Sequence, residues 1–294
     1  MPQRQGALAW ALLLALVSMW GSSFLFIKLG VATVPPATLV AARLGIGALI
    51  LVAVMRWRGL RFPAPGAIWL RYLALALVGN AIPFFLITWG QRVVDSALAG
   101  ILMAVMPLAT LVLAHLLVHG ERMTAGRVIG FIAGFAGIVV LMTGRATTGG
   151  GEVALIYPLA VLCGALCYAA NSVMTRLLAR GDVLVASAGT LLLATLVSLP
   201  FALYADRPWA LAPSASSLAA IAWLGVGPTA VATLCYFRLI GLAGPTFMSL
   251  VNYLSPPVAV FLGISLLGER PHISAYAGLA LILAGIGISQ VRRS

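Results

Sequence analysis

A three-residue motif, Gly-Glu-Arg, occurs twice in this chain, and each copy directly follows a long apolar segment. Gly120-Glu121-Arg122 recurs as Gly268-Glu269-Arg270, 148 residues further along (268 − 120 = 148). The same offset aligns Gly130 with Gly278, Trp20 with Tyr168 and Lys28 with Arg176. A chain of 294 residues that aligns with itself at half its length contains two copies of one unit. The relative orientation of the two copies then constrains both fold and function.

The composition predicts an integral membrane protein. Apolar residues make up 62% of the chain and charged residues 8%, far from the values of a soluble domain. The net charge of +12 comes from basic residues scattered singly between apolar stretches. That distribution is typical of charges that orient a protein in a bilayer rather than of a nucleic-acid surface. We therefore expect the lipid bilayer and a small-molecule substrate as partners, and no nucleic acid.

Apolar stretches of about 20 residues, bounded by charge, Pro or Gly, predict ten membrane-spanning helices. They cover 7–29, 36–55, 70–91, 96–118, 125–143, 154–178, 184–204, 216–239, 245–267 and 273–290. Five fall in each copy, which gives a first five-helix repeat over 1–144, a polar, Gly-rich linker over 145–152, and a second repeat over 153–294. The first stretch is too long for a signal peptide and has no cleavage site, so we interpret it as a helix.

The basic residues in the connections predict the orientation. One side carries Arg4, Arg56, Arg58, Arg61, Arg71, Arg122, Arg127, Arg176, Arg180, Arg238, Arg292 and Arg293, and the other carries Lys28, Arg92, Arg145, Arg207 and Arg270. This bias places both termini in the cytoplasm. Five spans per copy then require the second copy to enter the membrane from the opposite face, so the repeat is inverted. Such a pair of halves has two packings of similar energy around a central site, which predicts a transporter.

Prolines at matching places in the two halves predict bends or gates near that site. Pro83 corresponds to Pro228 after a small gap, and Pro107 corresponds to Pro256. Each Pro removes a backbone donor and lets the helix bend. The alternative is that these are the ordinary prolines of membrane helices.

Polar and aromatic residues collect near these prolines, and we predict that they bind the substrate. The predicted binding residues are Trp20, Ser23, Asn80, Phe84, Trp89, Met103, Met106, Tyr168, Asn171, Tyr236, Met248, Asn252 and Tyr253. Aromatic rings would stack with an apolar part of the substrate, Ser and Asn would meet its polar part, and Met would form an adaptable wall. For any single aromatic or Met residue, ordinary packing is an equal alternative. The three Asn residues could instead join helices by hydrogen bonds.

The positions of the charged residues limit the mechanism. All six acids map to connections or helix ends, so no carboxylate is expected at mid-membrane to carry a proton. An uncoupled facilitator or exchanger of neutral or zwitterionic solutes fits that pattern. Arg43 and Lys28 could attract a phosphate or carboxylate, although Lys28 can also reach the membrane surface. His115 and His119 with Glu121 could hold a metal, but His272 lies on the other face; we expect no metal, no cofactor and no catalytic residues.

A stripe of small residues, Gly126, Gly130 and Gly134, lies on one face of the fifth predicted helix. It predicts close helix packing, either within the chain or across a homodimer, and a monomer is compatible with it.

These residues resemble a known family. Trp20-Gly21-Ser22-Ser23-Phe24, Arg43 and Met106-Pro107 leading to the first Gly-Glu-Arg motif resemble the EamA-type repeat of the drug/metabolite transporter superfamily, and Leu254-Ser255-Pro256-Pro257 with the second motif repeats it. The resemblance implies ten helices, with helices 5 and 10 peripheral and helices 1, 3, 4, 6, 8 and 9 around the cavity. Within the superfamily the chain most resembles the YddG-type exporters of the bacterial inner membrane, which release aromatic and other amino acids.

The prediction is therefore an all-α, ten-helix inverted-repeat exporter of the bacterial inner membrane that works by alternating access. A sugar-phosphate or nucleotide-sugar carrier is one alternative, but it should focus several basic residues on the cavity. A membrane-embedded transferase is an alternative of another class, but it needs paired acids or a buried base. A scaffold protein would need larger parts outside the membrane.

Overall fold

The computed structural model describes residues 6–118, 123–146, 152–178 and 181–290, and every regular element in these ranges is helical. The first half contains α1 (Ala7–Gly30), α2 (Pro36–Trp57), α3 (Ala67–Ala76), η1 (Leu77–Ala81), α4 (Ile82–Gly90), α5 (Ser96–Met103), α6 (Met106–Leu117) and α7 (Ala125–Ala146). The second contains α8 (Glu152–Leu178), α9 (Val183–Asp206), η2 (Pro208–Ala210), α10 (Ala215–Leu224), η3 (Gly225–Val231), α11 (Ala232–Met248), α12 (Leu250–Leu267) and α13 (Ile273–Gln290). The first Gly-Glu-Arg motif, His119 and residues 147–151 of the predicted linker lie outside the described ranges.

These elements assemble into ten helical crossings, which confirms the predicted fold class. Nine segments of the described chain are long and apolar enough to span a membrane, and Ile273–Ser289 is a shorter apolar helix. Two crossings are composite: α3, η1 and α4 form the third, and α10, η3 and α11 form the eighth. The fourth is formed by α5 and α6. Most predicted boundaries agree within about three residues, because hydropathy and helix breakers fix where a span can start and stop.

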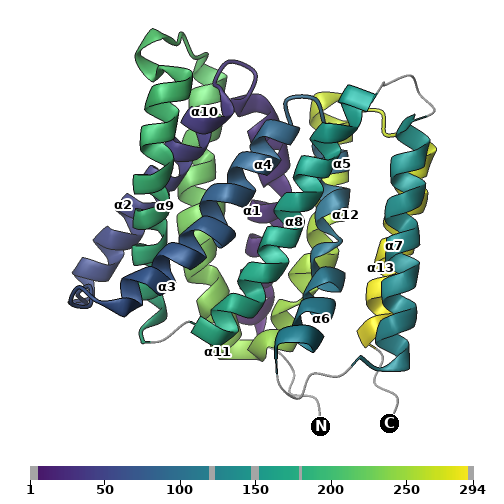
Figure 1. Cartoon of the computed structure of the whole chain (residues 1–294), viewed down its shortest axis with the longest axis horizontal. Coiled ribbons are helices and arrows are strands. Elements are labelled where there is room, and N and C mark those ends of the chain that lie inside the picture. The colour runs from purple at the N-terminus through teal and green to yellow at the C-terminus, as the bar shows by residue number, and fades with distance from the viewer. Residues whose placement is uncertain (1–5, 119–122, 147–151, 179–180, 291–294) are drawn as a thin grey trace.

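The two halves enter the bundle from opposite ends, as the odd number of spans requires. We call the end where α1 begins the near end, and the end where α1 finishes the far end. In Figure 1, α13 finishes at the near end with the start of α1, whereas α7 finishes and α8 begins at the far end. The helix contacts follow the same symmetry, since α1 of the first half packs against α12 of the second, and α8 of the second half packs correspondingly against α6 of the first. The pairs α2–α9 and α7–α13 join equivalent helices of the two halves.

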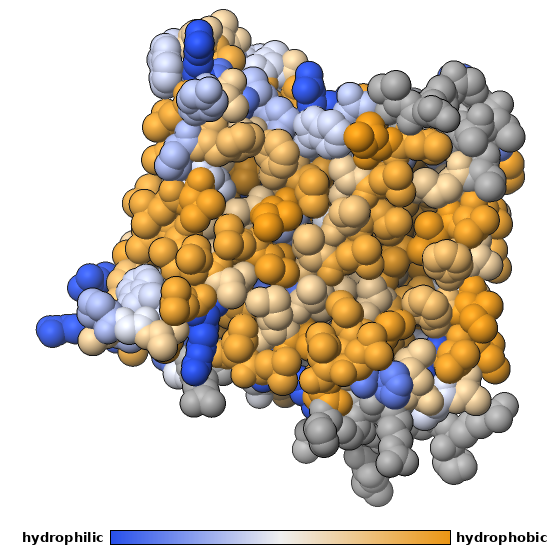
Figure 2. Space-filling view, viewed as in Figure 1, coloured by the Kyte–Doolittle hydropathy of each residue, from blue (hydrophilic) through white to orange (hydrophobic). Residues whose placement is uncertain are grey.

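The outer surface matches a lipid environment. Figure 2 shows a broad hydrophobic band across the middle of the bundle, with hydrophilic residues gathered toward its upper and lower ends. Large apolar side chains are exposed on this surface, such as Leu49 at 73% and Phe261 at 66%. Water would penalise so much exposed apolar surface, whereas lipid tails do not.

The glycine stripe on α7 is used inside the chain. A side chain at Gly130 would meet the Gly285 carbonyl of α13, and one at Gly137 would lie 2.7 Å from the Gly278 carbonyl. Figure 1 shows α7 and α13 side by side at one edge of the bundle. Of the two arrangements that the sequence allowed for this stripe, intramolecular packing is the one present.

Candidate functional site

The two composite crossings contain π-helical turns at equivalent places in the repeat. In the first half η1 begins at Leu77, and in the second η3 begins at Gly225, which is the same offset (77 + 148 = 225). Pro83 lies in the first turn of α4, just after η1, and Pro228 lies within η3. A π turn is rare, appears mostly as a single turn inside an α-helix, and is frequently found at functional sites. Pro83 therefore lies directly after one π turn and Pro228 within the other.

Each π turn is covered by a side chain of the helix that leads the opposite half. The Trp20 indole N–H of α1 donates to the Pro228 carbonyl of η3 over 3.2 Å. The Asn171 amide of α8 packs over Gly79 of η1, where any side chain would collide with it. Ser23 is the repeat equivalent of Asn171 (171 − 148 = 23), but its hydroxyl is buried and donates to the Met19 carbonyl of its own helix at 2.9 Å.

Two aromatic pairs join the same helices. Trp20 of α1 lies against Tyr236 of α11, with ring centroids 6.0 Å apart, and Phe84 of α4 lies edge-on to Tyr168 of α8 at 6.3 Å. The α1–α11 pair and the α8–α4 pair are related by the repeat. The structure thus brings four of the predicted aromatic residues together as two pairs, which join corresponding helices of the repeat although Phe84 and Tyr236 are not at corresponding positions.

The remaining predicted residues fall into separate places. Met248 is buried in a cluster against which Trp20 and Tyr236 pack, and Met103 and Tyr253 pack against a second cluster that is centred on α5 and also includes residues of α7, α8, α12 and α13. Trp89 lies away from the π turns, 4.7 Å from Tyr157 near the far end. Tyr157 is absent from the predicted set, because nothing in its neighbourhood on the sequence marks it as the partner of a ring 68 residues away (157 − 89 = 68).

The asparagines do not act as hydrogen-bonded links between helices. Asn80, Asn171 and Asn252 are half-buried, and within the described ranges none of their side-chain amides makes a hydrogen bond. Their amides are also absent from the polar atoms that are both unpaired and fully enclosed, which are Thr88 Oγ1, Gln91 Oε1 and Ser96 Oγ. An amide in hydrocarbon without a partner is costly, and these three amides keep their donors and acceptors without protein partners among the described residues.

The fourth and ninth crossings are interrupted differently. The fourth breaks between α5 and α6, at Ala104 and Val105, directly before Met106 and Pro107, which both remain half-buried. Just before the ninth crossing, the chain bends at Gly244 (φ 78°, ψ 169°), within α11 and ahead of α12. The helix α12 itself continues through Pro256. A positive φ of this kind is easily adopted only by glycine.

Arg43 of α2 lies beside this site although the predicted set omits it. Its Nε donates to Thr229 Oγ1 of η3 over 2.9 Å, and its Cζ lies 3.9 Å above the Phe84 ring. Arg43 is only 6% exposed. The sequence signal was the presence of a charge inside an apolar span, but not the identity of its neighbours.

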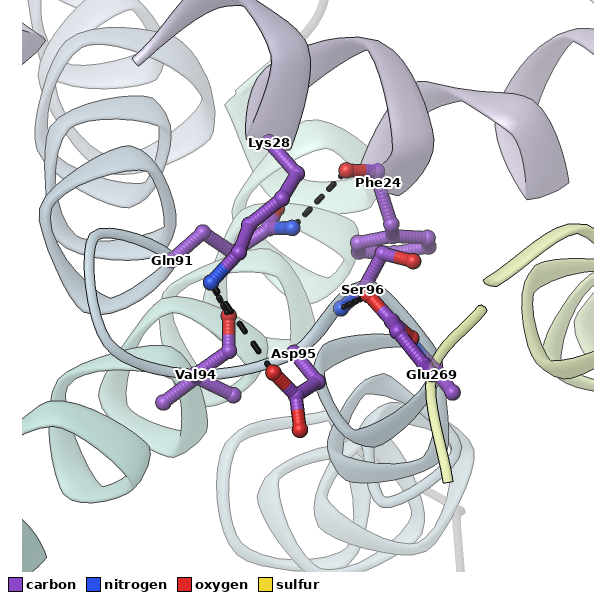
Figure 3. Close-up of polar contacts among 8 residues, drawn as sticks. Phe24, Lys28, Gln91, Val94, Asp95, Ser96 and Glu269 are labelled. Carbon is purple, nitrogen blue, oxygen red and sulfur yellow. Dashed lines mark hydrogen bonds and ion pairs between the residues drawn. The ribbon is translucent and has the colours of Figure 1, made fainter. Parts of the chain in front are cut away.

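A polar cluster lies at the far end around the start of α5. Glu269 accepts hydrogen bonds from the backbone N–H groups of Ser96 and Ala97, at 2.7 and 2.8 Å. Lys28 Nζ donates to the Val94 carbonyl at 3.0 Å and lies 3.9 Å from an Asp95 carboxylate oxygen, and Gln91 donates to the Phe24 carbonyl at 2.8 Å (Figure 3). The helix N-terminus and the carboxylate attract each other electrostatically. These contacts tie together, at this end, α1, the connection between α4 and α5, the start of α5 and the end of α12.

The other described acids also sit at helix ends. Asp182 caps α9 by accepting from the N–H groups of Leu184 and Val185, and Asp206 accepts from the Thr38 N–H and hydroxyl at 2.7 and 3.0 Å.

A surface hollow of about 530 Å³ lies at the end of α9. It is lined by Leu203, Tyr204, Ala205, Arg207 and Trp209, none of which belongs to the predicted site.

Fold and site together define a multi-pass membrane protein of two inverted, helix-broken halves, the architecture of a secondary transporter. The EamA-like transporter family matches residues 7–143 and 155–290, and the chain belongs to that family. It is 27% identical over 275 residues to the uncharacterized inner membrane transporter YedA of Escherichia coli (strain K12), covering 93% of this chain and 88% of that protein.

Further relatives align over similar lengths. Protein PagO of Salmonella typhimurium is 32% identical over 289 residues, covering 95% of this chain and 91% of that protein. A probable terminal-alkyne amino-acid exporter of Streptantibioticus cattleyicolor is 29% identical over 279 residues, covering 94% and 91%. A solved crystal structure superposes with a TM-score of 0.70 at 23% identity, over 97% of this chain and 99% of that one. Family membership decides between the transporter and the transferase that the sequence left as alternatives.

Proposed function

We propose that this protein exports small neutral or zwitterionic metabolites, amino acids with aromatic side chains among them, across a bacterial inner membrane by alternating access. The observation that carries the proposal is the pair of equivalent π turns, each covered by a residue of the helix that leads the other half. Two equivalent breaks in an inverted repeat let the halves rock about one central site.

The chemistry around the π turns supports this substrate class. Trp20 with Tyr236 and Phe84 with Tyr168 offer ring faces and edges to an apolar or aromatic side chain. The unpaired amides of Asn80, Asn171 and Asn252 offer donors and acceptors to a polar backbone. The relative from Streptantibioticus is named for an amino-acid substrate, and the resemblance to YddG-type exporters points the same way.

The mechanism proposed is uncoupled facilitation or exchange. The acids whose side chains are described, Asp95, Asp182, Asp206 and Glu269, all serve helix ends, so they are not free to carry protons through mid-membrane. The name of the Escherichia coli relative supports an inner-membrane location, and the excess of basic residues in near-end connections supports cytoplasmic termini.

Counterflow in proteoliposomes tests the proposal. The purified protein is reconstituted into liposomes that contain unlabelled amino acids. Uptake of labelled amino acids into these vesicles is then measured with and without an imposed pH gradient. We expect exchange of aromatic amino acids that does not require the gradient, and its loss in Trp20→Ala and Tyr168→Ala. The matched controls are Trp209→Ala and Tyr204→Ala, because both side chains are exposed, at 72% and 87%, far from the π turns. Uptake that requires the gradient, or variants that exchange normally, would contradict the proposal.

A further inference from the structure

Arg43 is the only charged residue that is buried in the part of the chain with described side chains. Its guanidinium can donate five hydrogen bonds, in a planar fork suited to a carboxylate. The structure uses one of these donors, Nε, which donates to Thr229. Within the described ranges the two terminal nitrogens, Nη1 and Nη2, have no hydrogen-bond partner and Arg43 forms no ion pair.

The two terminal nitrogens are unpaired without being sealed off. Thr88, Gln91 and Ser96 hold the described side-chain polar atoms that are both unpaired and fully enclosed, and Arg43 is not among these residues. The nitrogens therefore adjoin accessible space. A cation with a low-dielectric surround and no counter-ion is unfavourable, so an anion that enters this space gains a strong, charge-assisted contact.

The surroundings hold the fork in place. The Phe84 ring lies under the guanidinium carbon, Thr229 fixes Nε, and the Thr229 hydroxyl itself donates to the Leu224 carbonyl at 2.8 Å. Arg43 therefore contacts α4, next to η1, and also contacts η3. These elements belong to the two crossings that contain π turns. A purely bracing role would need only Nε and the ring contact, and it would leave the forked end without use.

The repeat is asymmetric at this position. The residue equivalent to Arg43 in the second half is Leu191 (43 + 148 = 191), which is also buried. One guanidinium matches one negative charge, whereas a phosphate dianion would call for further cations. A single cation on one side of the pseudo-two-fold axis also gives the bound solute a defined orientation.

We propose that Arg43 binds the carboxylate of the transported solute through Nη1 and Nη2, while the aromatic pairs receive its side chain. This inference rests on the proposed function and specifies the substrate as a monocarboxylate or a zwitterion that carries one.

Three probes that share one ring test the assignment by equilibrium binding to the purified full-length protein. They are L-phenylalanine, 3-phenylpropionate, which keeps only the carboxylate, and L-phenylalaninol, in which a hydroxyl replaces it. We expect both carboxylates to bind about 10- to 100-fold more tightly than phenylalaninol, the range for a hydrogen bond to a charged group. Arg43→Gln should abolish that preference, Arg43→Lys should keep part of it, and Arg92→Gln, which removes an exposed arginine, should leave it unchanged.

Several outcomes overturn the assignment. Equal binding of all three probes by the wild-type protein does so without any variant, and so does a failure of all three to bind. An Arg43→Gln protein that weakens the carboxylates and phenylalaninol alike indicates bracing alone. If Arg43→Gln does not fold, the wild-type probe series and Arg43→Lys decide.

Counterflow separates this inference from the proposed function. Equal exchange of phenylalanine and phenylalaninol would remove the carboxylate site and leave amino-acid transport standing. Arg43-dependent binding of 3-phenylpropionate without exchange of any amino acid would leave the site and remove the function.

Discussion

Replacing Glu269 with Gln should make the far end of the bundle open more often. The Glu269 carboxylate, just beyond the end of α12, holds the start of α5. It does so through two short hydrogen bonds from the buried backbone N–H groups of Ser96 and Ala97. An alternating-access cycle must part these helices at the far end to release a solute there. The carboxylate therefore stabilises the closed far end relative to the open one.

The size of the effect follows from the contacts. Gln keeps one acceptor oxygen and presents an NH₂ group, another donor, to the second N–H. The variant loses at least one charge-assisted hydrogen bond, and such a bond contributes about 1.5–3 kcal/mol. A loss of about 1.5–3 kcal/mol changes the ratio of closed to open molecules by about 10- to 160-fold.

Cysteine labelling measures this ratio. Ser96→Cys, in a background without Cys163, Cys167 and Cys235, places a thiol at a position that is fully buried in the closed state. The native Ser96 hydroxyl has no hydrogen-bond partner among the described residues, so the exchange removes no bond. When opening and closing are fast, the rate of reaction with a membrane-impermeant maleimide follows the open population. We expect Glu269→Gln to raise that rate by at least about 10-fold.

Asp182→Asn is the matched control. Asp182 also accepts from two backbone N–H groups, at 2.8 and 3.1 Å, but both belong to its own helix at the near end. This substitution should therefore lower stability without exposing the thiol introduced by Ser96→Cys. Equal labelling rates in Glu269→Gln and the parent protein, or equal increases in both variants, would refute the reasoning.

Two further substitutions test the packing that holds the site. Gly285→Ala should destabilise the protein by about 1–3 kcal/mol, because the atoms nearest to the new methyl group are backbone atoms of Gly130 and Gly134. Its control is Gly287→Ala, which has open space around it and should leave the thermal melting temperature unchanged or slightly raised. Gly79→Ala should abolish amino-acid counterflow, because its methyl group displaces the Asn171 amide from η1, whereas Gly241→Ala meets nothing and should exchange normally; equal activity of the two variants would contradict a role for that contact.

Much of the fold could be predicted from local sequence. Each span is an apolar stretch of nearly bilayer length, and lipid requires such a stretch to satisfy its backbone as a helix. The offset between the two Gly-Glu-Arg motifs, together with five spans per copy, then required an inverted repeat. Pro83 and Pro228 marked the two interrupted helices, because proline cannot donate the backbone hydrogen bond that a regular helix needs.

The composition of the site depended on contacts that no local pattern contains. The sequence placed Trp89 with the substrate-binding residues, but packing pairs it with Tyr157. It showed a charge at Arg43, but not that Phe84 and Thr229, from two other spans, would hold its guanidinium. It showed that Glu269 belongs to a repeated motif, but not that its carboxylate caps α5.

The sequence alone thus determined which segments are long and apolar enough to span a membrane, and that the two halves run in opposite directions, because the first depends on the transfer of each segment from water to lipid and the second on the odd number of spans per copy. Only the tertiary structure decided which side chains meet, and which of them remain without partners at the π turns. Those contacts join residues from about 40 to more than 200 positions apart, such as Phe84 with Arg43 and Trp20 with Pro228. Their geometry arises only when both halves pack around a common axis.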